Sequence, residues 1–77
     1  MTEQEVIARI QEQLPEAYIE PSGQDCQLAL TIISPAFEGK TLLARHRLIQ
    51  SYFKQELADG SLHALSLTTK TPQEISG

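Results

Sequence analysis

Three side chains in this 77-residue sequence could bind a soft or borderline metal: the single cysteine, Cys26, and two histidines, His46 and His63. A structural zinc site takes four nitrogen or sulfur ligands, so this chain cannot complete one by itself. A single cysteine also excludes a disulfide within the chain. Any soft-metal or cluster site must therefore take part of its ligands from a second molecule.

Of these three residues, Cys26 and His63 are the stronger candidates. Cys26 follows turn-forming residues at 22–25, which predicts an exposed thiol, although free cysteine is usually buried. His63 lies at the start of a predicted strand, where a metal ligand and a half-buried strand-end side chain are equally good interpretations. His46 lies on the apolar stripe of a predicted helix, which favours a packed, hydrogen-bonded histidine over a ligand.

A second group of residues is basic. Four of the six lysines and arginines lie within residues 40–54, which contain no acidic residue: Lys40, Arg45, Arg47 and Lys54. On one helix, residues seven apart are rotated about the axis by only about 20° per step. Lys40, Arg47 and Lys54 have this spacing and would form a stripe. Such a stripe could contact nucleic-acid phosphates, but a solvated helix face is the commoner explanation, and the net charge of −4 opposes attraction to polyanions.

The triplet at 39–41, Gly-Lys-Thr, is the end of a phosphate-binding loop motif and precedes a predicted helix. The full motif needs a glycine five residues before Gly39, where this chain has Ser34 followed by Pro35. A turn glycine followed by a threonine helix cap explains the triplet better. Paired carboxylates, a metalloprotease helix and a nucleophile elbow do not stand out either, so the sequence gives no support for enzyme activity.

Hydrophobic periodicity predicts the elements that position these residues. Thr2 and Glu5 have the spacing of a capping box and begin a helix that Pro15 ends. Strands are predicted at 17–20, stopped by Pro21, and at 28–33, joined by a turn that ends at Cys26.

The second half of the chain is predicted to form a long helix, a third strand and a final turn. The helix begins near Thr41 and ends at residues 59–60, and the strand covers 62–69. Thr71 and Glu74 repeat the capping-box spacing for a last helix of one turn at most. The long helix is predicted to bury a stripe of residues at steps of three and four: Leu42, His46, Ile49, Phe53 and Leu57.

The resulting order, α-β-β-α-β with a short C-terminal turn, predicts an α+β domain with a single three-stranded sheet and helices packed on one face. A chain with 40% apolar and 21% charged residues suits one globular domain over residues 1–77. The longest uncharged apolar stretch, 28–36, is far shorter than the roughly 20 residues of a membrane span. The N-terminus is acidic rather than basic. The sequence therefore predicts a cytoplasmic protein with no membrane association.

Four sequence blocks occur in order along the chain: Ser-Pro-Ala-Phe-Glu-Gly-Lys at 34–40, Arg-His-Arg-Leu-Ile at 45–49, Glu-Leu at 56–57, and His-Ala-Leu-Ser-Leu at 63–67 with Thr-Pro-Gln-Glu at 71–74. Together, in this order, they resemble the BolA family. The resemblance covers nearly the whole chain and implies a fold similar to class II KH domains. The GXXG loop with which KH domains clamp RNA is absent, so that mode of RNA binding is not implied.

The resemblance implies a partnership with monothiol glutaredoxins, in which a 2Fe-2S cluster is bridged between the two proteins. The glutaredoxin cysteine and a glutathione thiolate then supply part of the ligands. The family's histidine corresponds to His63, and its second ligand, His or Cys in the hairpin loop, corresponds to Cys26. Mixed histidine and cysteine ligation raises the potential of such a cluster above that of all-thiolate clusters. The function implied is a non-enzymatic adaptor in iron-sulfur cluster trafficking or iron homeostasis.

Some BolA-like proteins are also DNA-binding transcriptional regulators of stress response and cell morphology. In this chain the implied phosphate contacts are Lys40, Arg45, Arg47 and Lys54. Six of the ten acidic residues lie within 1–26 and oppose DNA binding. DNA regulation is therefore the alternative function, and homodimer formation is left open. The family's usual tryptophan after the Thr-Pro block is Ile75 here.

Overall fold

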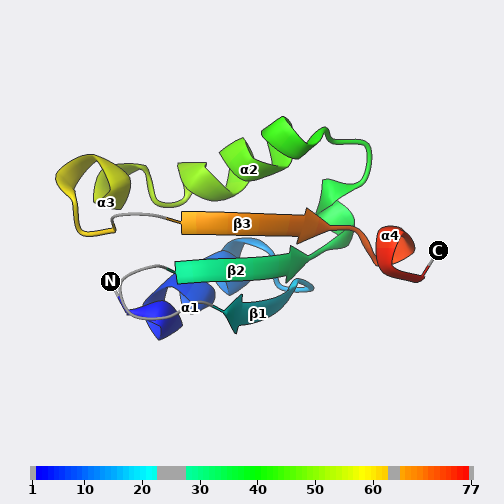
Figure 1. Cartoon of the computed structure of the whole chain (residues 1–77), viewed down its shortest axis with the longest axis horizontal. Helices are drawn as coiled ribbons and strands as arrows, with labels where there is room; N and C mark the ends of the chain where they lie inside the picture. Colours follow the sequence, from blue (N-terminus) through cyan, green and yellow to red (C-terminus); the bar gives the residue numbers. More distant parts are fainter. Residues whose placement is uncertain (1, 23–27, 63–64, 77) are drawn as a thin grey trace.

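The computed structural model of the chain describes residues 2–22, 28–62 and 65–76. The helices are α1 (Glu3–Gln13), α2 (Leu42–Ser51), α3 (Lys54–Asp59) and α4 (Pro72–Ser76), with a 3-10 turn, η1, at Pro35–Phe37. The strands are β1 (Tyr18–Ser22), β2 (Leu28–Ile33) and β3 (Leu65–Lys70). The predicted α-β-β-α-β order is confirmed, and α3 is an additional short helix (Figure 1).

The three strands form one mixed sheet with β2 in its centre. β1 is antiparallel to β2, and β3 is parallel to it, in a register that pairs Leu28 with Leu65 and Ile33 with Lys70. Parallel neighbours need a long crossover, which η1, α2 and α3 provide. The starts of β2 and β3 therefore meet at one end of the sheet (Figure 1).

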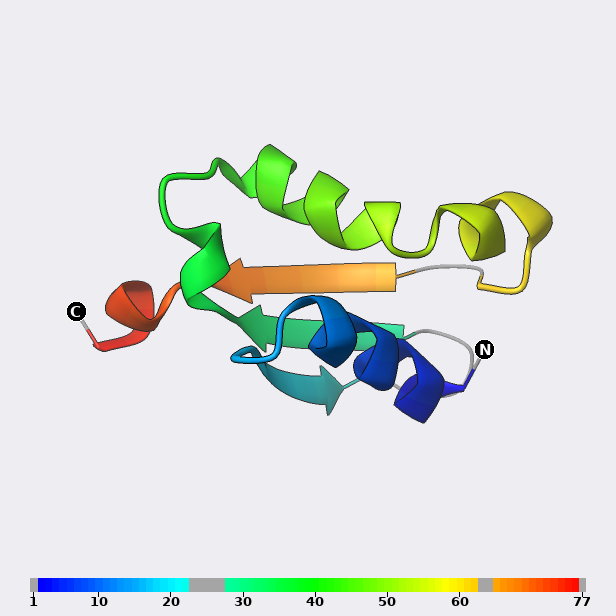
Figure 2. The ribbon, with the colours of Figure 1, turned by 180° about the vertical axis from the view of Figure 1, so that it is seen from behind.

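The helices and the sheet share one apolar core. α1 lies behind the strands in Figure 1 and in front of them in Figure 2, and none of the helices in the described part of the chain covers the strands on the side that faces the viewer in Figure 1. The predicted packing of helices on one face is therefore confirmed. The buried apolar residues come from α1, β2, η1, α2 and the segments on either side of α3: Val6, Ile10, Leu30, Ile32, Phe37, Ile49, Phe53 and Leu62.

The N-terminal helix begins as predicted. The Thr2 hydroxyl accepts the N–H of Glu5 at 3.2 Å, and the Glu5 carboxylate accepts the N–H of Thr2 at 3.2 Å. Further along α1, Arg9 Nη1 donates to the carbonyl of Tyr52 at 3.2 Å and pairs with Glu56 at 2.8 Å. These contacts join α1 to the α2–α3 junction.

The predicted end of the first strand and the predicted continuity of the long helix are wrong. β1 continues through Pro21 to Ser22, because β1 is an edge strand, where the missing N–H of proline is tolerated. The long helix predicted from Thr41 to residue 59 is broken between Ser51 and Lys54. The N–H groups of residues 52 and 53 bond to carbonyls three residues back, a tighter turn than the α-helix, and the turn leaves Phe53 fully buried.

The third strand is described over Leu65–Lys70, and Leu62, the first residue predicted for it, lies outside the strand. Leu62 is buried, and its N–H donates to the carbonyl of Glu56 at 3.1 Å, so it closes α3. Leu65 and Leu67 lie on one side of β3 and pack against the core. No helix among residues 2–22, 28–62 and 65–76 is long and apolar enough to cross a membrane.

Two threonines near the end of β3 are both buried but differ in hydrogen bonding. Thr69 is 2% exposed, and its hydroxyl has no partner in the described part of the chain, whereas the Thr71 hydroxyl accepts the N–H of Glu74 at 3.2 Å. Burying an unpaired hydroxyl costs about 1–3 kcal/mol. We therefore expect Thr69→Val to raise the free energy of unfolding by about 1 kcal/mol and Thr71→Val to lower it by about as much. Urea unfolding measures both; a loss of stability in Thr69→Val would contradict the assignment.

Candidate functional site

Cys26 and His63, the two predicted cluster ligands, lie outside the described residues. Each precedes by two positions the first described residue of a strand, Leu28 of β2 and Leu65 of β3. Leu28 and Leu65 are direct partners in the parallel register. The sheet therefore brings the beginnings of the two strands that follow the candidate ligands side by side.

The third candidate, His46, lies on α2 and is half-buried. Within residues 2–22, 28–62 and 65–76, no group of three or more histidine, cysteine, aspartate and glutamate side chains is placed to hold a metal ion. A metal site built only from these residues is therefore absent.

The loop before α2 has the structure expected of a turn and a cap. Gly39 has φ +77°, a backbone region that favours glycine because other residues have a Cβ that clashes there. The Thr41 hydroxyl accepts the N–H of Ala44 at 3.1 Å and caps α2. The interpretation of Gly39 and Thr41 as turn and cap is confirmed.

The predicted basic stripe is divided among three elements. Lys40, Arg47 and Lys54 are all exposed, but Lys40 precedes α2, Arg47 lies within it, and Lys54 begins α3 after the break. The three cations therefore do not follow one continuous helix, as the spacing alone suggested.

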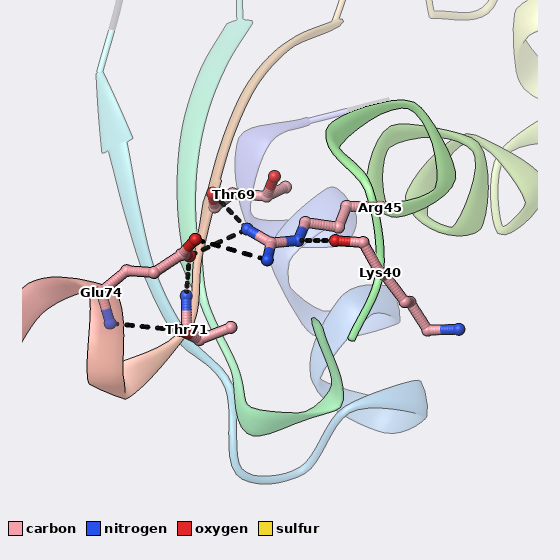
Figure 3. A network of polar contacts seen from close by, with 5 residues as sticks. All are labelled: Lys40, Arg45, Thr69, Thr71 and Glu74. Carbon is pink, nitrogen blue, oxygen red and sulfur yellow. Dashed lines mark hydrogen bonds and ion pairs between the residues drawn. The ribbon is translucent and has the colours of Figure 1, made fainter. Parts of the chain in front are cut away.

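Arg45 is the fourth basic candidate, and it is only 6% exposed. Its Nε donates to the carbonyl of Lys40 at 3.0 Å, and its Nη1 donates to the carbonyl of Thr69 at 3.3 Å. Both Nη atoms donate to the Glu74 carboxylate, at 2.9 and 3.4 Å (Figure 3). The guanidinium also lies 5.9 Å from the centre of the Phe37 ring.

These contacts correct the sequence-based role of Arg45. A guanidinium that already bonds two carbonyls and a carboxylate has few donors left for a phosphate. Figure 3 shows the side chain of Lys40 pointing away from this network, while Arg45 points into it. Arg45 therefore links α2, β3 and α4, and only Lys40, Arg47 and Lys54 remain as exposed cations of the predicted set.

Glu74 is the acidic centre of the same network. Its carboxylate accepts the N–H of Thr71 at 2.7 Å, while its own N–H donates to the Thr71 hydroxyl. The predicted capping box at Thr71 and Glu74 is therefore confirmed. Because the same carboxylate also binds Arg45, the box fastens α4 to α2.

Residues 8–74 match the family model described as BolA-like protein. The chain belongs to the BolA family. This BolA-like chain is 46% identical over 57 residues to UV-induced protein uvi31 of Schizosaccharomyces pombe, an alignment that covers 73% of this chain and 55% of that protein. It is 54% identical over 46 residues to SufE-like protein 1, chloroplastic/mitochondrial, of Arabidopsis thaliana, which covers 60% of this chain and 12% of that protein. The chain thus spans about half the length of the first relative and a much smaller part of the length of the second.

Solved structures confirm the fold of the BolA-like chain. A bolA protein homologue from Coxiella burnetii superimposes with a TM-score of 0.80 at 31% identity and covers 100% of this chain and 99% of that one. BolA1 of Mus musculus gives a TM-score of 0.78 at 30% identity, and the alignment covers 96% of this chain and 68% of that one. The BolA domain of SufE1 from Arabidopsis thaliana gives a TM-score of 0.75 at 35% identity, and the alignment covers 96% of this chain and 98% of that one.

In this BolA-like chain, stability should depend on pH through Glu74. The Arg45 guanidinium, and then the N–H of Thr71, lower the pKa of Glu74 below its ordinary 4.5. The carboxylate therefore stabilises the fold above the pKa of the unfolded chain, and this contribution is lost as pH falls through the lowered pKa. Glu74→Gln should destabilise the protein near neutral pH, and its difference from wild type should shrink below about pH 4.5. Urea unfolding across this range measures the difference; a pH-independent one would contradict the prediction.

Proposed function

We propose that this BolA-like chain is a non-enzymatic adaptor that shares a 2Fe-2S cluster with a monothiol glutaredoxin, in iron-sulfur cluster trafficking or iron homeostasis. The parallel register of β2 and β3 is the observation that supports this most. It pairs Leu28 with Leu65, and the residues with sulfur and nitrogen donors, Cys26 and His63, each precede one of that pair by two positions. Two donors far apart in sequence thus each precede the start of a strand, and these two strand starts are neighbours in the sheet.

The donor types suit this cargo. Thiolate and imidazole are both ligands of 2Fe-2S clusters, as in Rieske-type centres. Cys26 and His63 would supply two ligands, and the glutaredoxin cysteine and glutathione would supply the others. The cluster is then cargo held between two proteins, so the absence of a larger ligand group among the described residues does not oppose the proposal.

Reconstitution with a partner tests the proposal. The purified chain is mixed with a monothiol glutaredoxin, glutathione, iron and sulfide under anaerobic conditions, and visible absorption and circular dichroism are recorded. We expect a spectrum that differs from that of the glutaredoxin alone, from a species in which both proteins elute with the cluster. If an excess of the chain leaves the glutaredoxin spectrum and its elution unchanged, the proposal is wrong. The chain alone is the control and should retain no cluster.

DNA-binding regulation of stress response and cell morphology is the second candidate. The exposure of Lys40, Arg47 and Lys54 favours it, whereas the engagement of Arg45 by Glu74 removes one of the four expected contacts. Three phosphate contacts would give a slope of log affinity against log salt of about −2.7. A titration of duplex DNA at two salt concentrations measures this slope. It compares wild type with a variant in which Lys40, Arg47 and Lys54 are changed to glutamine. Equal affinity and equal slope in that variant would exclude the contacts.

A further inference from the structure

α2 begins with two large apolar side chains that are exposed to solvent. Leu42 is 63% exposed and Leu43 is 60% exposed, whereas Arg45 and Ile49 face the interior. The sequence predicts a buried Leu42, and this prediction is wrong. Leu42 is the first residue of α2, and Arg45 takes the inward position in the same turn through its bonds to β3 and α4.

Two exposed cations lie close to these leucines in sequence. Residues three and four apart on a helix are neighbours, so Leu42 lies beside His46, and Leu43 lies beside Arg47. Lys40 lies two residues before the helix, and both Lys40 and Arg47 are exposed. α2 contains no aspartate or glutamate. These five residues are termed the α2 face.

The composition of the α2 face favours a protein ligand over a nucleic acid. Protein interfaces combine an apolar centre with a charged or polar rim, and adjacent exposed apolar residues often mark such sites. Phosphates are bound by cations and gain nothing from leucine, and single-stranded nucleic acid is bound by aromatic stacking, for which the α2 face has no phenylalanine, tyrosine or tryptophan. Its positive rim is complementary to carboxylates.

We propose that the α2 face is a docking surface for a protein segment that presents apolar side chains flanked by carboxylates. Leu42 and Leu43 pack against the apolar side chains of that segment, while Lys40 and Arg47 pair with its carboxylates. The occupant is thus an acidic, amphipathic segment of another protein.

This surface is distinct from the end of the sheet that supports the cluster proposal. Arg45, in the first turns of α2, bonds the carbonyl of Thr69 near the end of β3, and Figure 1 shows the beginning of α2 beside the arrowhead of β3. Leu65, the first described residue of that strand, lies four residues earlier, or about 13 Å away at 3.3 Å per residue. The docking proposal therefore does not depend on the cluster.

Two synthetic peptides test this proposal on the full chain. The first forms a helix with leucines along one face and glutamates on both sides, and the second has lysines in place of the glutamates. We expect fluorescence anisotropy to show binding of the glutamate peptide only. The Leu42→Ser, Leu43→Ser double variant should bind it at least about tenfold more weakly, which corresponds to about 1.4 kcal/mol. Lys40→Gln with Arg47→Gln should weaken binding and reduce its salt dependence.

Tyr18→Ser is the matched control, because Tyr18 is 59% exposed on β1 at the other edge of the sheet. This variant should bind the glutamate peptide like wild type. So should His63→Ala, which separates the docking proposal from the cluster proposal. All substituted residues of the α2 face are exposed, and thermal unfolding confirms that each variant is folded.

Several results would overturn the proposal. These are no binding of the glutamate peptide up to about 1 mM, equal binding of both peptides, or wild-type affinity in the double leucine variant. Binding of duplex DNA that depends on Lys40 and Arg47 but not on the leucines would identify phosphates as the ligand instead. A wild-type dimer that the leucine substitutions convert to a monomer in sedimentation would identify a second copy of the chain.

Discussion

Replacing His63 by alanine is expected to abolish the 2Fe-2S cluster that we propose the chain shares with a monothiol glutaredoxin. The chain is proposed to contribute only two donors, so a lost imidazole removes one of its two ligands to the cluster. Absorption and circular dichroism of the reconstituted mixture should then fall to the spectrum of the glutaredoxin alone. Cys26→Ser should alter the spectrum as well, because a hydroxyl replaces the thiolate.

His46→Ala is the matched control for this experiment, since His46 is the other histidine of the chain and lies half-buried on α2. We expect it to give the wild-type spectrum. The ligand assignment is wrong if His63→Ala yields a cluster with the same spectrum and lifetime as wild type. An effect of His46→Ala equal to that of His63→Ala would likewise point to a general loss of structure.

Arg45→Ala is expected to be the most damaging substitution of a charged residue for stability. It leaves the carbonyls of Lys40 and Thr69 without their donor and removes the guanidinium that lies over Phe37. We expect a loss of about 2–3 kcal/mol in the free energy of unfolding. A domain of 77 residues has only about 4–12 kcal/mol in total, so this is a large fraction. Urea unfolding near neutral pH measures it.

Arg47→Ala provides the comparison, because Arg47 is exposed two residues further along the same helix. Its effect should stay within about 0.5 kcal/mol. Arg45→Lys should fall between the two, since an ammonium can reach one acceptor but cannot reproduce the planar fork of the guanidinium. If Arg45→Ala and Arg47→Ala were equally mild, the Arg45 network would not contribute to stability.

Sequence patterns predict the structure correctly where interactions between neighbouring residues decide it. Thr2 and Thr41 cap helices through hydroxyls that accept N–H groups three residues on, and Gly39 adopts a positive φ in a turn. The capping box at Thr71 and Glu74 also forms as its spacing predicts. Each of these features depends on a few neighbouring residues, so it can be recognised without knowing the fold.

Helix periodicity failed where distant residues decide the structure. It assigned Leu42 to the buried stripe, and the DNA-binding alternative placed Arg45 among the phosphate contacts, whereas Leu42 is 63% exposed and Arg45 only 6%. The partner that holds Arg45 inward, Glu74, lies 29 positions later, and no pattern within α2 indicates it. The break before α3 was missed for a similar reason, since Phe53 turns into a core that α1 and β2 complete.

The sequence alone determined the family, the order of elements and the two candidate ligands, because residue types and spacings carry that information directly. Tertiary structure decided which strand starts, following the two candidate ligands in sequence, lie side by side, and which cations face solvent. Cys26 and His63 are 37 positions apart in the chain. Only the parallel pairing of β2 with β3, which hydrogen bonds between distant strands create, brings the strand starts that follow them together.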